Sequence, residues 1–186
     1  MIDYWAIIHK YIDPASLTYR YYLPHVTLVT YEALNIARRL GLSEEQLRFI
    51  EEAAMLHDIG IIKVSAERIG CTGDLPYICH CVEGRRMLEQ EGLSRHALVA
   101  ERHVGGGLSK ADIVENDYPL PHRDMMAESM EEKIISWADL FYEKNPNKLW
   151  IRKSPDKVRR DLLDWGQDKL RVFEEWKILF GGEPGF

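Results

Sequence analysis

The sequence lacks the features of exported, disulfide-stabilised and membrane-spanning proteins. Only three cysteines occur among its 186 residues, Cys71, Cys79 and Cys81. This odd number, with no secretory segment before it, favours a reduced cytoplasm over a disulfide framework. Residues 1–17 carry charged side chains among the apolar ones, which fits neither a signal peptide nor a membrane span. The rest has no long apolar run, fixed-period repeat or low-complexity segment, so we expect a cytoplasmic protein without a membrane partner.

An excess of basic residues is also missing. The chain has 24 Lys and Arg against 30 Asp and Glu, a formal net charge of −6. This balance argues against a nucleic-acid scaffold that works by neutralising phosphates. It leaves nucleotide substrates open, because a bound metal pair would reverse the local field. A chain of this length buries about 70% of its unfolded surface, so we expect one domain over residues 1–186.

Helical periodicity and capping signals dominate the chain, and no convincing alternating strand appears, so the predicted class is all-α. Capping boxes at Ser43–Gln46 and Ser129–Glu132 mark two helix starts. Residues 61–76 are predicted to form a loop. The predicted helices are 3–11, 25–40, one that Ser43 begins, 77–91, one from Ser94 to His103, a short one at Ser109, one that carries Asp139, and a last and longest one over 155–180.

The most informative stretch is His57-Asp58-Ile59-Gly60, where an apolar helix ends. A buried carboxylate such as Asp58 needs a partner that offsets its desolvation, and a cation is the natural one. Imidazole and carboxylate together suit first-row transition metals, and adjacent residues can serve one metal centre where the backbone leaves regular helix. Gly60 allows the chain to turn away at that point. The stretch therefore predicts a metal site.

Four further polar residues lie in apolar or glycine-rich surroundings: His25, His80, His103 and Asp139. A bare polar side chain is costly there. Any one of them could be a core residue bonded to a carbonyl, but the whole set is better explained by one shared ligand set. A Cys79-His80-Cys81 zinc clip is disfavoured, because adjacent helical residues point about 100° apart.

The order His25, His57-Asp58, Asp139 resembles the pattern of the HD superfamily of metal-dependent phosphohydrolases, and Ile59-Gly60 matches its HDIG branch. The segments 101–107 and 130–139 look closest to small prokaryotic HDIG proteins that are predicted hydrolases. The resemblance covers residues 23–147. It implies a helical bundle with the metal site at its centre.

His80 and His103 resemble the extra ligands of two-metal members, such as symmetrical dinucleoside tetraphosphatases and cyclic-di-nucleotide phosphodiesterases. By this resemblance, one ion is held by His25, His57, Asp58 and Asp139, and a second by Asp58, His80 and His103. One or two ions of Fe, Mn, Ni, Zn or Co are expected, with Asp58 as the bridge. The implied activity is hydrolysis of a small phosphorylated substrate, above all a nucleotide, by a metal-activated water.

Beyond the metal ligands, the candidate catalytic residues are Asp58 itself, Lys63 and Arg123. Many relatives carry a lysine directly after HDIG, whereas here two isoleucines precede Lys63. Arg123 and Lys110 are candidate phosphate contacts, since arginine can grip phosphate through two donors. Residues 105–107 are glycines that permit close backbone approach to a ligand.

Two other functional classes remain open. The same six ligands resemble those of HD-fold mixed-valence di-iron oxygenases such as inositol oxygenase, and the ligand set alone does not separate the two chemistries. A non-catalytic sensor of metal or nucleotide is the third class, although such a sensor need not keep all six ligand positions.

The segment 155–180 contributes no expected ligand but carries an apolar stripe that includes Trp165, Phe173 and Trp176. We expect this helix to pack on the catalytic core. An alternative is that part of the stripe, with Trp150 and Phe180, forms the interface of a homodimer or covers the substrate cleft.

Overall fold

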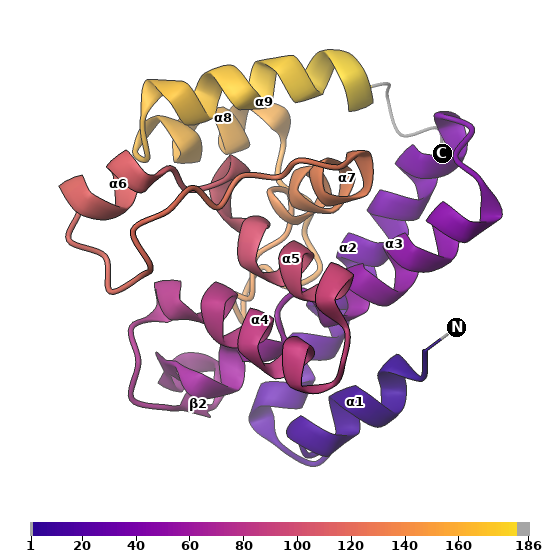
Figure 1. Ribbon diagram of the computed structural model, residues 1–186, viewed down its shortest axis with the longest axis vertical. Coiled ribbons are helices and arrows are strands. Elements are labelled where there is room, and N and C mark those ends of the chain that lie inside the picture. Colours follow the sequence, from indigo (N-terminus) through magenta and orange to yellow (C-terminus); the bar gives the residue numbers. More distant parts are fainter. Residues whose placement is uncertain (1, 182–186) are drawn as a thin grey trace.

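The computed structural model describes residues 2–181, and within them the fold is built from helices with one very small sheet (Figure 1). The α-helices are α1 Tyr4–Tyr11, α2 Leu17–Arg39, α3 Glu44–Leu56, α4 His80–Gln90, α5 Ser94–Arg102, α6 Lys110–Glu115, α7 Met130–Asp139, α8 Pro155–Leu163 and α9 Gln167–Phe180. Short 3₁₀ turns are η1 Ile59–Lys63, η2 Glu67–Ile69, η3 Tyr77–Cys79 and η4 Val104–Gly106. The prediction of a helical bundle is confirmed.

Helix α2 is the longest element and begins earlier than predicted. It starts at Leu17, where the Ser16 side chain accepts a hydrogen bond from the Tyr19 backbone, and it runs through Pro24. Proline inside a helix removes one backbone hydrogen bond, which is why the sequence pattern suggested a start at His25. Tertiary contacts offset that loss: Tyr22 is buried and its hydroxyl donates to the Met55 carbonyl oxygen at 2.7 Å.

The predicted loop over residues 61–76 is partly ordered, which corrects the prediction that the chain has no strand. The strands β1 Ser65–Ala66 and β2 Cys71–Thr72 pair antiparallel around η2. Gly70 closes this hairpin with a φ of +80°, a conformation that glycine adopts without penalty. Strands of two residues are too short to show an alternating pattern in the sequence.

The last predicted helix is broken into α8 and α9, so the prediction of one continuous helix over 155–180 is wrong. Gly166 lies between them with a φ of +133°, which residues with a Cβ rarely adopt. The break turns Trp165 out of the expected buried stripe, and 44% of it is exposed. Phe173 and Trp176 are buried as expected, and the Phe173 ring stacks on Trp137 with centroids 4.9 Å apart.

Helix α7 starts at the predicted cap but with a different hydrogen-bond pattern. Ser129 accepts from the Glu132 backbone N–H at 3.1 Å. The Glu132 carboxylate accepts from the Glu128 backbone N–H at 2.9 Å and from Arg102 at 3.1 Å, so the capping box is only half formed. Ser43 and Gln46 form the complete box predicted for α3.

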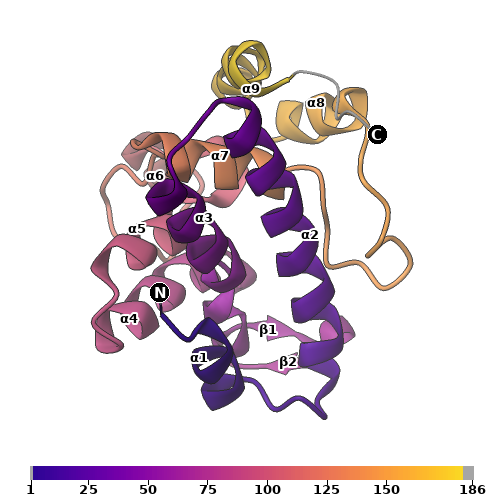
Figure 2. The ribbon, with the colours of Figure 1, turned by 90° about the vertical axis from the view of Figure 1, so that its right-hand side faces the viewer.

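The buried apolar side chains form two clusters, and members of both are sequence neighbours of the metal-ligand candidates. One cluster is built around Leu56, Ile59 and Leu88, and the other around Ile36, Ile135 and Phe141. Helix α2 packs against α3 and α7, while α4 packs against α5 and η1. In Figure 2, α2 runs along the molecule from the hairpin to the level of α8 and α9. The site is therefore enclosed by segments from most of the chain.

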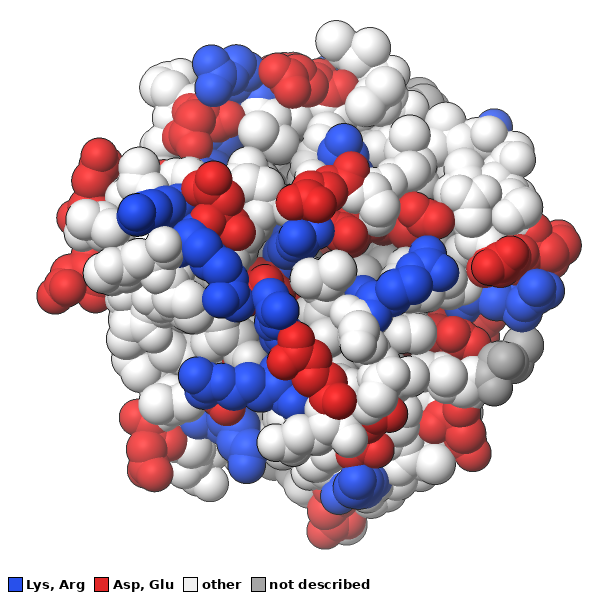
Figure 3. Space-filling view, in the orientation of Figure 1, with Lys and Arg blue, Asp and Glu red and all other residues white. Residues whose placement is uncertain are grey.

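The surface carries charges of both signs. On the face seen in Figure 3, basic and acidic side chains are interspersed. Among the described residues, no helix is long and apolar enough to span a bilayer.

Candidate metal centre

Six side chains from five helices or helix ends converge inside the bundle. His25 lies in α2, His57 and Asp58 follow α3, His80 begins α4, His103 follows α5, and Asp139 ends α7. Two groups have ligand atoms that all lie within 4.8 Å of one another. One group is His25, His57, Asp58 and Asp139, and the other is Asp58, His80 and His103. Asp58 belongs to both.

The two oxygens of the Asp58 carboxylate face the two groups separately. Oδ2 lies 3.0 Å from His25 Nε2 and 3.3 Å from His57 Nε2. Oδ1 lies 3.4 Å from His80 Nε2 and 3.6 Å from His103 Nε2. The carboxylate is therefore oriented to contact two neighbouring cations, one through each oxygen.

Asp139 completes the first group. Its Oδ1 lies 3.0 Å from His25 Nε2 and 3.4 Å from His57 Nε2. The side chain is 17% exposed, whereas those of His25, His57 and Asp58 are fully buried. Solvent therefore reaches the centre on the Asp139 side.

Three of the histidine rings are fixed by the same local hydrogen bond. Nδ1 lies close to the carbonyl oxygen three residues earlier: 2.7 Å for His57, 2.6 Å for His80 and 2.9 Å for His103. A carbonyl oxygen only accepts, so Nδ1 carries the proton and donates it. In a neutral ring the lone pair is on Nε2, which is the atom directed at the centre, and His57, whose pKa is raised, would release its second proton to bind a cation there.

The arrangement of His80 and His103 fits a cation between them. Burial lowers the pKa of both rings, to about 3 for His103, so both are neutral. Their Nε2 atoms are 3.2 Å apart and each carries a lone pair. Two nitrogens bound to one first-row ion, each about 2.1 Å from it, lie roughly 3.0–3.4 Å apart. The same spacing without a shared cation would be repulsive.

The carboxylates give the site negative charge. Burial by itself would raise the pKa of Asp58, but Lys144 and His57 hold it well below its ordinary value, and the neighbouring His25 and His57 do the same for the pKa of Asp139. Burial would lower the pKa of His57, yet the two carboxylates raise it to about 10. The two buried carboxylates thus draw positive charge to the centre, as the proton on His57 and the Lys144 ammonium show, and a bound cation would supply the same kind of charge.

Several buried polar atoms at the centre lack a hydrogen-bond partner. They are His25 Nδ1, His57 Nε2, Asp58 Oδ1 and Asp139 Oδ1. Unsatisfied buried polar atoms are rare because each costs about 1–3 kcal/mol. His57 Nε2, Asp58 Oδ1 and Asp139 Oδ1 point at the centre, and they are nitrogen and oxygen atoms of the kind that bind transition metals. The residues present therefore fit a metal ion.

The residues predicted to contact substrate lie away from the metal centre. Lys63 ends η1 with an exposed side chain and belongs to neither group of ligand atoms. Arg123 is 49% exposed and forms an ion pair with Glu101, which also accepts from Arg85 at 2.5 Å. Lys110 is exposed at the start of α6. The structure brings none of these three into the cluster.

Lys144, which lies in the segment after α7, contacts the cluster although it was not among the residues predicted for the site. Its Nζ lies 2.5 Å from Asp58 Oδ2 and 3.2 Å from His25 Nε2. The carboxylate raises the pKa of Lys144 in spite of burial, so the side chain is charged. The only sequence signal is its position five residues after Asp139, and a lysine near a helix end is most often solvated.

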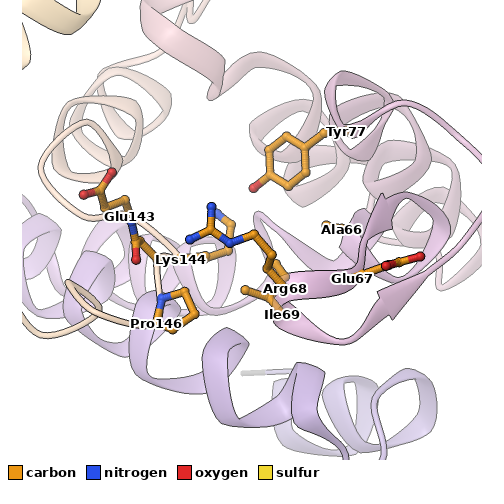
Figure 4. Close-up of a pocket in the computed structure, with 9 residues that line it drawn as sticks. Ala66, Glu67, Arg68, Ile69, Tyr77, Glu143, Lys144 and Pro146 are labelled. Atoms are coloured by element: carbon orange, nitrogen blue, oxygen red, sulfur yellow. The ribbon is translucent and has the colours of Figure 1, made fainter.

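Lys144 also lines a pocket of about 390 Å³ that lies beside the centre (Figure 4). The pocket is formed by the hairpin region on one side and the segment after α7 on the other. Its lining residues are Ala66, Glu67, Arg68, Ile69, Tyr77, Glu143, Lys144, Asn145 and Pro146.

Residues 22–142 match the HD domain family, a range that holds all six converging side chains. The chain belongs to the HD domain family. The resemblance inferred from the motifs is thereby confirmed. A fold with a buried His and Asp cluster that is able to bind metal ions is typical of these domains.

Two curated relatives match about half of the chain. An uncharacterized protein of Methanocaldococcus jannaschii is 32% identical over 97 residues, which cover 52% of this chain and 50% of that protein. A tRNA (cytidine(56)-2'-O)-methyltransferase of Picrophilus torridus is 30% identical over 93 residues, 50% of this chain and 24% of that protein. The match thus spans half or less of the relatives' own length.

The fold of this HD domain protein is also similar to a solved structure. That structure is the HD domain of the L. monocytogenes phosphodiesterase PgpH in complex with cyclic-di-AMP. The likeness covers 97% of this chain and 96% of the other, with a TM-score of 0.53 and 12% sequence identity. At this identity the likeness shows a shared fold.

Proposed function

We propose that this HD domain protein is a metal-dependent phosphohydrolase that acts on a small nucleotide or a related phosphate ester. In this proposal, His25, His57, Asp58 and Asp139 hold one ion, and Asp58, His80 and His103 hold a second. Fe, Mn, Ni, Zn and Co all suit this mixture of nitrogen and oxygen ligands. The solved HD domain that shares the fold contains a bound nucleotide, which supports a nucleotide as the substrate class.

The observation that carries the proposal is the orientation of Asp58. Its two oxygens face different histidine pairs, at 3.0 and 3.3 Å on one side and at 3.4 and 3.6 Å on the other. A purely structural metal site would be closed by its protein ligands, whereas a catalytic one keeps open positions. The groups supply four and three residues, so an ion that takes five or six ligands would have positions left for water or a substrate oxygen.

Metal ions in such a site supply a water of lowered pKa and polarise the phosphoryl oxygens. The residues of the chain set the conditions for that chemistry. Burial of the histidines excludes bulk water, the carbonyl bonds to Nδ1 fix the rings, and Asp139 faces the side from which solvent and substrate enter. The Lys144 ammonium adds positive charge at the same opening, where it can stabilise an incoming phosphate.

The test combines metal content with product release. The purified protein is analysed for bound metals and then assayed for phosphate or nucleotide release from a nucleotide panel with manganese, iron, nickel and cobalt in turn. Asp58→Asn keeps the shape of the side chain but removes its charge. We expect it to lose bound metal and to lower turnover by about 100-fold or more. Asp74→Asn, at an exposed position outside the cluster, is the matched control and should leave both unchanged.

Two results would contradict the proposal. One is a metal-loaded protein that releases no product from any phosphate ester of the panel. The other is oxygen consumption by the iron-loaded protein with oxidation of an organic substrate, which would identify an HD-fold oxygenase instead.

A further inference from the structure

The pocket of about 390 Å³ lies beside the metal centre and shares two neighbours with it, Lys144 and Tyr77. Lys144 lines it, and the Nζ of the same lysine lies 2.5 Å from Asp58 Oδ2. Tyr77 lines it as well, and its ring centroid is 4.8 Å from that of His80. A ligand in this pocket therefore has one end within reach of the proposed metal ligands.

Positive groups gather in the same space. Arg68 is exposed on η2, and no carboxylate of residues 2–181 lies within ion-pairing distance of its guanidinium. Figure 4 shows this side chain extending into the pocket toward Lys144, with the Tyr77 hydroxyl directed at the same region. The carboxylates of Glu67 and Glu143 point away from it in that view. An ammonium has three N–H donors, so Lys144 can donate to a ligand while it contacts Asp58, and Arg68 and Tyr77 can donate to the same anionic group.

The remaining walls and the volume restrict the rest of the ligand. Ala66, Ile69 and Pro146 provide apolar surface next to the cationic groups. A volume of about 390 Å³ lies near the lower end of the range of small-molecule sites, about 300–1,000 Å³. This size suits one nucleoside better than two linked ones.

We propose that this pocket binds a phosphomonoester of the size of a nucleoside monophosphate, with Arg68 and Lys144 gripping its phosphate on either side. The inference rests on the proposed phosphohydrolase function and narrows its substrate to monoesters. A terminal phosphate carries close to two negative charges, which two cations and the tyrosine hydroxyl can match. The phosphodiester groups of a cyclic dinucleotide carry one each and bring a second nucleoside.

Arg68 gives the cleaner test, because Lys144 also contacts Asp58 and its replacement would disturb the metal centre. The probe is the phosphonate analogue of adenosine 5'-monophosphate, in which carbon replaces the ester oxygen so that no turnover occurs. Its binding to the purified protein is measured by calorimetry, beside adenosine and cyclic-di-AMP. Arg68→Gln should weaken binding of the phosphonate about tenfold or more, which is the range for loss of a charged hydrogen bond. Binding of adenosine, which has no phosphate, should not change.

The matched control is Arg160→Gln. Arg160 is exposed on α8, does not line the pocket and forms no ion pair with the described carboxylates, so its replacement removes the same charge elsewhere. We expect the Arg160→Gln variant to bind the phosphonate with the same affinity as the unchanged protein. In turnover assays, Arg68→Gln should raise KM for a nucleoside monophosphate more than it lowers kcat.

The outcomes separate this inference from the proposed function. Equal affinities for the Arg68 and Arg160 variants, tighter binding of cyclic-di-AMP than of the monophosphate analogue, or no binding of the analogue at all would overturn the pocket assignment. Each of these can occur in a protein that still releases phosphate from other esters. Arg68-dependent binding without any phosphate release would instead support the pocket and contradict the phosphohydrolase function.

Discussion

Three histidines of the metal centre obtain their orientation from the backbone that carries them. His57 and His103 each follow the last turn of a helix, and His80 follows a 3₁₀ turn. The carbonyl groups at the ends of α3 and α5 lack a helical partner, whereas the Tyr77 carbonyl also accepts from the His80 backbone N–H. In each case the carbonyl three residues earlier accepts the Nδ1 proton, which turns Nε2 inward. A helix end thus fixes both the tautomer and the direction of the ring, so the site is preorganised by local structure.

A second residue-scale feature is the buried lysine of α9. Lys169 is 1% exposed, and its Nζ lies 2.5 Å from Asp112 Oδ2 and 2.8 Å from Asp168 Oδ2. Asp112 also caps α6, where it accepts from the Ser109 backbone at 2.6 Å. The pair therefore fastens α6 to the C-terminal segment. Removing one partner of a buried ion pair is costly, because the other charge stays buried.

We predict that Asp112→Asn lowers the free energy of unfolding by about 1–3 kcal/mol at pH 7, less than for a fully buried pair because the Asp112 side chain is 19% exposed. Burial would raise the pKa of Asp112, but hydrogen bonds from Lys169 and Ser109 lower it. A lowered pKa in the folded state stabilises the protein above the unfolded value, and this contribution disappears as the pH falls through the folded one. Urea unfolding should therefore show the gap to the unchanged protein closing below about pH 4.

Asp168→Asn is the control for this prediction. Asp168 contacts the same lysine, but its side chain is 47% exposed, so water can replace it and we expect a loss below about 1 kcal/mol. Equal losses in the two variants, or a gap that stays constant down to pH 3, would refute the assigned role of Asp112.

At the scale of elements, the contact between η1 and α4 places the second group of ligands. Gly60 lies against the start of α4: a Cβ on Gly60 would lie 2.1 Å from the His80 carbonyl oxygen and 2.3 Å from the Gly84 nitrogen. Both are backbone atoms and cannot move independently of the helix. The absence of a side chain at Gly60 thus lets His80 approach the turn that carries Asp58.

We predict that Gly60→Ala destabilises the protein by about 4 kcal/mol or more, or prevents folding, because the helix must move away from η1. Gly41→Ala is the matched control. Gly41 has a φ of +70° and open space around it, so only backbone strain of about 1 kcal/mol is expected. Thermal unfolding of both variants measures the difference. A Gly60 variant as stable as the Gly41 variant would show that the two elements are not in this tight contact.

For the whole molecule, the ligand set links parts of the chain that are distant in sequence. Its members come from α2, the end of α3, α4, the end of α5, and α7. An ion bound by them therefore stabilises the folded state as a whole, and at a concentration 100 times its Kd it adds about 2.7 kcal/mol. Stability and metal binding should be coupled.

We predict that a chelator lowers the Tm of the metal-loaded protein by about 5–10 °C, the shift that such a free energy produces in a domain of this size. Differential scanning calorimetry with and without the chelator measures it. The Asp58→Asn variant should show a Tm that does not respond to the chelator. A response of the same size in that variant would mean that the stabilising metal binds elsewhere.

The sequence by itself determined the helical class and the identity of the converging residues. His57 and Asp58 are covalent neighbours at a helix end, so their shared role is local information. His25, His80, His103 and Asp139 could be recognised because polar side chains are costly in apolar segments. The sequence also determined the cap of α3, since Ser43 and Gln46 interact within one turn.

Only the tertiary structure decided which basic side chains lie at the metal centre and its neighbouring pocket, and where the helices break. Lys144 and Arg68 lie 76 positions apart in the chain, 144 − 68, and face one pocket because the path after α7 passes the hairpin. Arg123 had the right chemistry for phosphate but is paired with Glu101. Side-chain charge and helical periodicity are local properties. Which group a lysine or arginine side chain pairs with depends on how distant segments pack, because any carboxylate that packs nearby can form an ion pair with it.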